Sequence, residues 1–201
     1  MDPLDARARF RELREQDGPV DPAELDRIWA ALATVRPEEI LGEWKGGEFR
    51  TGHPLNGALE KAGWYGKTFA SVHDAKPLIC RDATGALFSD RELGKGEASL
   101  WTVEFRGEAT ATMVYDGQPV FDHFKRVDDT TLMGIMNVKG VPAEGPFFYF
   151  FLERAPGADR ETTSATAHAS AAETAGETGS GTGSESTTDG RRAGTRAGED
   201  S

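Results

Sequence analysis

The fold is decided by residues 108–138, which read EATATMVYDGQPVFDHFKRVDDTTLMGIMNV. Three runs rich in Val, Thr, Met, Phe and Tyr are separated here by Asp116-Gly117 and by Asp128-Asp129. β-Branched and aromatic residues favour strands, whereas Asp and Gly favour tight turns. Because tight turns join only antiparallel neighbours, the stretch predicts three consecutive antiparallel strands at residues 108–116, 120–127 and 131–138.

The same pattern extends to both sides of this stretch. Further strands are expected at residues 40–50, 63–71, 76–81, 86–90, 99–106 and 147–154. A parallel sheet would need a helix between successive strands, and such helices are missing from the pattern. The sequence therefore predicts a mainly β domain, either an antiparallel sandwich or a barrel.

Helical patterns are confined to two places. The first 38 residues predict two helices, one ending before Asp17-Gly18-Pro19 and one beginning at Pro22 with Asp21 as its N-cap. A third helix is expected at residues 53–62, inserted between the first two predicted strands. Several late strands carry apolar residues on both faces, so their outer face must be covered by the N-terminal helices or by a second subunit of a homodimer.

Composition narrows the classes of partner. The 201 residues carry a net charge of −11 without a cluster of Lys and Arg, which argues against binding nucleic acid or an anionic membrane surface. No secretory signal and no run of 18 apolar residues is present, so we expect a cytoplasmic protein that is not integral to a membrane. The single cysteine, Cys80, excludes an internal disulfide and is expected to be a buried small apolar residue.

The last part of the chain has a different composition. Residues 155–201 contain no Val, Ile, Leu, Met, Phe, Trp, Tyr or Cys. Such a segment cannot bury enough apolar surface to offset the entropy of ordering it. The sequence therefore predicts a β domain at residues 39–154 followed by a disordered tail, which can be removed without loss of fold or ligand binding.

One motif connects the chain to a known family. Residues 42–49 read Gly-Glu-Trp-Lys-Gly-Gly-Glu-Phe, and the chain here resembles the GXWXG family, whose members carry this Gly-x-Trp-x-Gly run near the start of the domain. Residues 113–116, 119–124 and 149–154 resemble the domain of unknown function that usually follows in that family. Together the two resemblances cover most of the predicted folded chain.

The Gly-x-Trp run is also similar to the first strand of lipocalin, fatty-acid-binding and nitrobindin barrels. This similarity implies an antiparallel calycin-like β-barrel with the inserted helix near its mouth, and the predicted N-terminal helices are expected to pack on this barrel. Because a barrel pairs its first and last strands, Trp44 and Arg154 are expected to be neighbours, with the guanidinium over the indole. Lipocalin-like barrels show the same pairing.

The late strands are dense in aromatic and Met side chains, which favours an adaptable apolar cavity inside the barrel. The candidate ligand-binding residues are Trp64, Tyr65, Phe69, Met113, Tyr115, Phe121, His123, Met136 and Tyr149. Asp122 and His123 interrupt an apolar strand, and as strand neighbours they point to opposite faces. Periodicity alone does not decide which of the two faces the interior.

The sequence leaves several functions open. The leading hypothesis is non-catalytic binding or transport of a hydrophobic small molecule, such as a lipid or a fatty-acid-like ligand. The alternatives are a haem protein of the nitrobindin type with a His ligand, a small isomerase or hydratase with Asp122 or His123 as general base, and an interaction module without a ligand. Apart from haem no cofactor is expected, and His53, His73 and His123 show no spacing typical of a metal site.

Overall fold

The computed structural model describes residues 1–141 and 145–156. The helices are α1 (Pro3–Glu15), α2 (Pro22–Ala31), a 3-10 helix η1 (Pro37–Ile40), α3 (Ala58–Lys61) and α4 (Arg91–Gly94). The strands are β1 (Ala33–Thr34), β2 (Gly42–Glu48), β3 (Trp64–Ser71), β4 (Asp74–Arg81), β5 (Leu87–Ser89), β6 (Ala98–Phe105), β7 (Glu108–Tyr115), β8 (Val120–Asp128), β9 (Thr131–Val138) and β10 (Phe148–Arg154). The fold is thus mainly β, as predicted. Within these described residues, none of the helices is long and apolar enough to cross a membrane.

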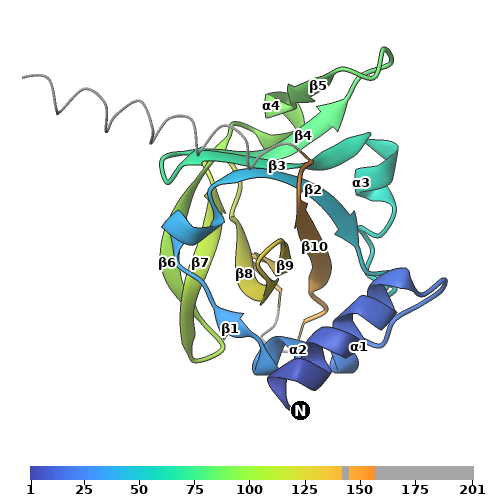
Figure 1. The fold of residues 1–201 in the computed structure, drawn as a ribbon. Coiled ribbons are helices and arrows are strands. Elements are labelled where there is room, and N and C mark those ends of the chain that lie inside the picture. The colour runs from blue at the N-terminus through green and yellow to red at the C-terminus, as the bar shows by residue number, and fades with distance from the viewer. Residues whose placement is uncertain (142–144, 157–201) are drawn as a thin grey trace, which may run out of the picture. The chain divides into compact units, whose positions relative to one another are not determined.

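The longer strands pair in a closed path, which we call the strand ring (Figure 1). The order is β8, β7, β6, β4, β3, β2, β10, β9 and back to β8, with antiparallel neighbours throughout. β1 and β5 lie beside this path, paired with β8 and β4. The ring closes where β2 pairs with β10, in a register that sets Trp44 opposite Arg154.

Glycines allow the close packing around Trp44. Gly42 has a φ of 121°, in a region that side chains rarely permit. A Cβ atom on Gly46 would overlap the ring of Trp64, and one on Gly66 would overlap the backbone carbonyl of Trp44. Gly46 and Gly66 therefore let β2 and β3 approach each other closely, with the ring of Trp64 packed against Gly46.

Side chains alternate between two apolar clusters along each strand. On β10, Phe148, Phe150 and Leu152 belong to one cluster, together with Trp44 and other residues from around the ring. Phe147 and Tyr149 belong to the second cluster, which also contains buried residues of α1 and α2. The first cluster is thus the interior of the ring, and the second lies between its outer face and the helices.

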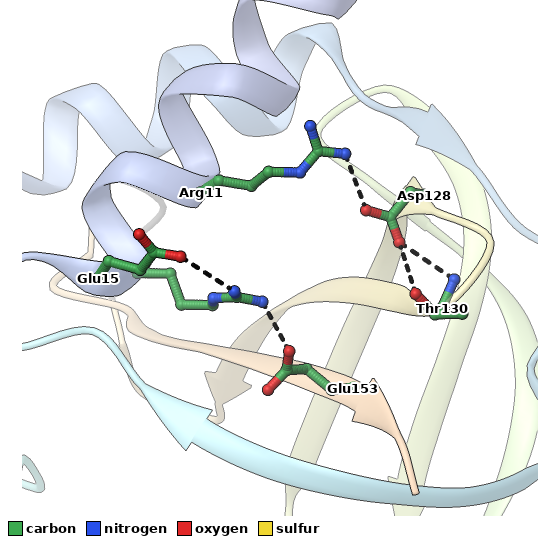
Figure 2. Close-up of polar contacts among 6 residues, drawn as sticks. Arg11, Glu15, Asp128, Thr130 and Glu153 are labelled. Atoms are coloured by element: carbon green, nitrogen blue, oxygen red, sulfur yellow. Dashed lines mark hydrogen bonds and ion pairs between the residues drawn. The ribbon is translucent and has the colours of Figure 1, made fainter. Parts of the chain in front are cut away.

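The helices α1 and α2 cover the outer face near β8, β9 and β10. Phe10 of α1 is fully buried there, with its ring 5.4 Å from that of Phe49. Figure 2 shows two ion pairs along the same helix, Arg11 to Asp128 at 3.1 Å and Arg14 to Glu153 at 2.6 Å. The N-terminal helices therefore provide the cover that the two-faced apolar strands require.

Four local elements differ from expectation. The inserted helix begins only at Ala58, because Gly57 has a φ of 79° and residues before it form turns. β1 and η1 were not expected, since each consists of two to four residues without a periodic pattern. α4 was not expected either; its N-cap is Asp90, whose side chain accepts a hydrogen bond from the backbone N–H of Leu93. The predicted tail lies largely outside the described residues, which end at 156.

Candidate functional site

An apolar pocket of about 340 Å³ lies beside α3 and α4. Its lining comes from five strands and two helices, including Leu59 of α3, Leu78 of β4 and Met136 of β9. Leu55 and Leu93 also line it and are 45% and 46% exposed, which places them at its opening. We call this space the outer chamber. The two exposed leucines make the rim of the pocket apolar.

A smaller space of about 40 Å³ adjoins the outer chamber, and we call it the inner chamber. The two spaces share five lining residues: Leu59, Leu78, Tyr115, Met136 and Phe148. The inner chamber adds Trp64 and Phe150 and two charged residues, Lys67 and Asp122. The apolar pocket therefore has polar chemistry at its inner end.

Lys67 and Asp122 form a buried ion pair. The distance from Lys67 Nζ to Asp122 Oδ2 is 2.8 Å, and the side chains are only 4% and 2% exposed. Lys67 Nζ also donates a hydrogen bond to the carbonyl of Pro77 at 3.2 Å. The hydroxyl of Tyr115 lies 3.5 Å from the same Asp122 oxygen. Such a pair is tolerated in an apolar interior because each charge has a partner and further hydrogen bonds.

Aromatic rings surround the Lys67 ammonium. Its nitrogen lies 5.5 Å from the ring centroid of Trp64, 5.8 Å from that of Tyr115 and 5.2 Å from that of Phe150. Ring faces attract a cation, and the attraction grows when water is excluded. The three rings therefore hold the ammonium in place at the inner end of the pocket.

Burial changes the acidity of the two oxygen groups beside Lys67. It raises the pKa of the Asp122 carboxyl, and the Lys67 ammonium opposes that rise by attraction and by its hydrogen bond. Burial and the negative charge of Asp122 hold the pKa of Tyr115 well above its usual value. Tyr115 is consequently a neutral hydroxyl that can donate a hydrogen bond to Asp122.

The second oxygen of Asp122 is different from the first. Asp122 Oδ1 is buried and has no hydrogen-bond partner within residues 1–141 and 145–156. A buried acceptor without a donor costs free energy, and natural structures contain few of them. Asp122 lines the inner chamber, and its Oδ1 is a buried acceptor to which the described protein groups supply no donor.

His123 lies on the opposite side of β8. Its ring stacks on Phe105 at 3.9 Å between centroids, and its Nδ1 lies 2.8 Å from the hydroxyl of Thr112. Burial, with a smaller contribution from the positive charge of Arg106, lowers the pKa of His123 to about 4. Of the two polar residues that interrupt this strand, Asp122 faces the interior and His123 does not. A haem in the pocket would gain no axial ligand from His123.

The structure brings together only some of the predicted ligand-binding residues. Trp64, Tyr115 and Met136 line the chambers. Phe69 and Met113 are packed in the interior cluster away from both chambers. The remaining predicted residues lie elsewhere: Phe121 beside His123 on the outer side of β8, Tyr149 in the outer cluster with its hydroxyl 2.6 Å from Asp26, and Tyr65 at a separate depression where it contacts Arg81.

Sequence reasoning missed Lys67 as a pocket residue. A signal was available, because Lys67 stands two positions before Phe69 on one strand, and residues two apart share a face. The apolar residues Leu59, Leu78 and Phe148 were missed for another reason, since nothing local distinguishes a pocket-lining Leu or Phe from a core one. In the part of the chain that the structure describes, no three His, Cys, Asp or Glu side chains gather to hold a metal ion.

Comparisons with known proteins agree with the sequence motif. The family model "GXWXG protein" matches residues 27–85, and the model "Domain of unknown function (DUF4334)" matches residues 96–154. A search of curated proteins gave no match.

A crystal structure of a protein from Thermomonospora curvata has a similar fold, with a TM-score of 0.69 and 38% sequence identity. The alignment covers 75% of this chain and 99% of that one. Both matched models include residues of the pocket, Lys67 in the first and Asp122 in the second. The chain belongs to the GXWXG protein family, and its residues 96–154 match the DUF4334 domain.

Proposed function

We propose that the protein binds, and thereby stores or transports, a hydrophobic small molecule inside a strand ring that acts as a calycin-like β-barrel. The observation that carries this proposal is the adjacency of the two chambers: an apolar pocket of about 340 Å³ shares its walls with a small polar end that holds Lys67 and Asp122. A lipid or fatty-acid-like molecule has the same division between apolar body and polar end.

The size and lining of the outer chamber support this function. Small-molecule sites in proteins usually have volumes of about 300–1,000 Å³, with mostly apolar walls and a few polar groups that fix orientation. The outer chamber is near the lower end of that range. It suits a single short acyl or terpene-like chain. Each Å² of apolar ligand surface removed from water contributes about 25 cal/mol to binding.

Entry takes place between two short segments. Leu55 precedes α3 and Leu93 is in α4, and both helices have only four residues. Such short helices have little stability of their own and separate at small cost. A ligand therefore enters by displacing the segments around α3 and α4 rather than by opening the strand ring.

Native mass spectrometry of the purified protein, followed by lipid extraction, tests the proposal. We expect bound apolar molecules, and saturable uptake of a medium-chain lipid added to the stripped protein. The variant Met136→Trp fills the shared wall of the two chambers and should abolish uptake. Phe121→Trp, which places the same indole group on the outer side of β8, is the matched control. Equal uptake by both variants would contradict binding in this pocket.

One observation favours a second function, proton transfer by Asp122. Its carboxyl lies at the end of an apolar pocket, and burial raises its pKa, as in many general bases and acids. In that case Asp122 Oδ1 takes a proton from a carbon next to a ligand carbonyl and returns it to another. Incubation of small unsaturated ketones with the protein in deuterated water tests this. Deuterium incorporation that is lost in the Asp122→Asn variant would support proton transfer by Asp122. If no deuterium is incorporated, proton transfer is excluded for those ketones.

A further inference from the structure

We propose that the ligand of the inner chamber is an apolar alcohol, whose hydroxyl group donates a hydrogen bond to Asp122 Oδ1. This inference rests on the proposed binding function and deepens it. Among ligands with an apolar body, the inference specifies the chemical group at the polar end.

The hydrogen-bond inventory of the inner chamber points to a donor on the ligand. Asp122 Oδ2 lies 2.8 Å from Lys67 Nζ and 3.5 Å from the Tyr115 hydroxyl, so it already has partners. Trp64 Nε1 donates to the carbonyl of Pro77 at 3.3 Å. Asp122 Oδ1 alone among these acceptor atoms has no partner in the described chain. An ether or ester oxygen cannot satisfy it, because those groups only accept hydrogen bonds.

Charge balance excludes an ionised ligand end. Lys67 and Asp122 together carry no net charge, and both are almost completely buried. A carboxylate ligand would add an uncompensated negative charge next to Asp122, and an ammonium ligand would add an uncompensated positive charge next to Lys67. Placing an unpaired charge in an apolar interior costs several kcal/mol. A neutral hydroxyl supplies the missing donor and leaves the balance unchanged.

The dimensions also fit a hydroxyl. The inner chamber measures about 40 Å³, which is room for a group of about the size of one water molecule. The rest of the ligand must then lie in the outer chamber, whose lining is almost wholly apolar. This arrangement favours an unbranched or slender molecule with a terminal hydroxyl.

Three probes of similar length separate these chemistries: decanol, nonyl methyl ether and decanoate, the last at a pH well above the pKa of its acid. Binding is measured by titration calorimetry on the delipidated full chain. We expect decanol to bind roughly tenfold more tightly than the ether, because a hydrogen bond to a charged acceptor has about that effect. Decanoate should bind more weakly than decanol.

The outcomes distinguish the two proposals. If the ether equals decanol in affinity, the open oxygen of Asp122 has no role and the alcohol inference is wrong. If decanoate binds most tightly, the pocket selects fatty acids, and the binding function stands without the alcohol inference. If no probe binds, the proposed binding function fails and the alcohol inference fails with it.

Substitutions at the ion pair give an independent test. Asp122→Asn leaves Lys67 without its carboxylate partner. The order of affinities should therefore reverse, so that decanoate binds more tightly than decanol. The double variant Lys67→Met with Asp122→Leu removes both charges and keeps the site apolar, which protects folding if the single variant is unstable. It should bind decanol and the ether equally. Asp116→Asn, an equivalent change in an exposed turn, should leave all three affinities unchanged.

Discussion

The guanidinium carbon of Arg154 lies 4.3 Å from the centroid of the Trp44 ring. The two residues also stand opposite each other where β2 pairs with β10, and an Arg154 N–H donates to the carbonyl of Leu41. This contact was predicted from the sequence, and the structure confirms it. It fixes the two ends of the strand ring to each other.

Replacing Arg154 with Ala should lower the free energy of unfolding by about 1–2 kcal/mol, because both the cation–π contact and the packing of the arginine stem are lost. Urea denaturation measures the change. Arg81→Ala is the matched control, since Arg81 lies 4.6 Å from the Tyr65 ring at an exposed site and should cost about 0.5 kcal/mol. Equal losses in the two variants would show that Arg154 is not a special contact.

The protein should lose stability in acid because of His123. The pKa of His123 is about 4 in the folded protein, whereas an unperturbed histidine in the unfolded chain has a pKa of 6.5. Between these two pH values the unfolded chain binds a proton at His123 and the folded protein does not. The free energy of unfolding should therefore fall as the pH decreases from 6.5 to 4, by up to about 3 kcal/mol.

The variant His123→Phe tests this pH dependence. The new ring can still stack on Phe105, and the Thr112 hydroxyl keeps the carbonyl of Thr110 as an acceptor. Its stability should change little over the same pH range, apart from the smaller contribution of His53, whose pKa is also lowered by burial. A parallel decline in both proteins would assign the acid sensitivity to other groups.

Breaking the buried ion pair should be costly, and removing it entirely should not be. Lys67→Met leaves the buried Asp122 without its cation and should cost about 3–5 kcal/mol. The double variant Lys67→Met with Asp122→Leu should recover most of that loss. Thermal unfolding of the four proteins in the mutant cycle measures the coupling. A double variant less stable than both single variants would contradict this account.

The attachment of α1 should depend on burial rather than on charge. Phe10→Ala removes a fully buried ring and should cost about 3–5 kcal/mol. Arg11→Ala breaks the ion pair with Asp128, but the Arg11 side chain is 54% exposed, so the loss should stay below about 0.5 kcal/mol. Chemical denaturation of the two variants compares them. A larger effect at Arg11 would mean that the ion pairs in Figure 2 hold the helix.

Strand positions were predictable from the sequence because local chemistry determines them. β9 matches its predicted range, and β7 and β8 differ by one residue at the end, where Asp116 and Asp128 enforce the turns. The Trp44–Arg154 contact was predictable only through the barrel hypothesis, because a barrel pairs its first and last strands, whereas the strand pattern alone also allowed a sandwich. Elements of two to four residues such as β1 and η1 were not predictable, because they depend on tertiary contacts: the Val35 N–H, for example, donates to Thr110 on β7.

The site was only partly predictable. Aromatic and Met density indicated a pocket but not which face of each strand lines it: Tyr115 and Met136 line the outer chamber, whereas Tyr149 is in the outer cluster. The pairing of Lys67 with Asp122 joins residues 55 positions apart. Such a pairing depends on the register of the whole ring, which no short stretch of sequence encodes.

Ring closure between β2 and β10 also has a consequence for how the protein is made. The Arg154 contact with Leu41 joins residues 113 positions apart, so the ring cannot close until the ribosome has synthesised β10. Until then β2 and β9 have unpaired edges, and the interior cluster faces water. Contacts this distant along the chain slow folding and leave nascent chains prone to aggregation. The nascent protein is therefore expected to need protection by chaperones until its last strand emerges.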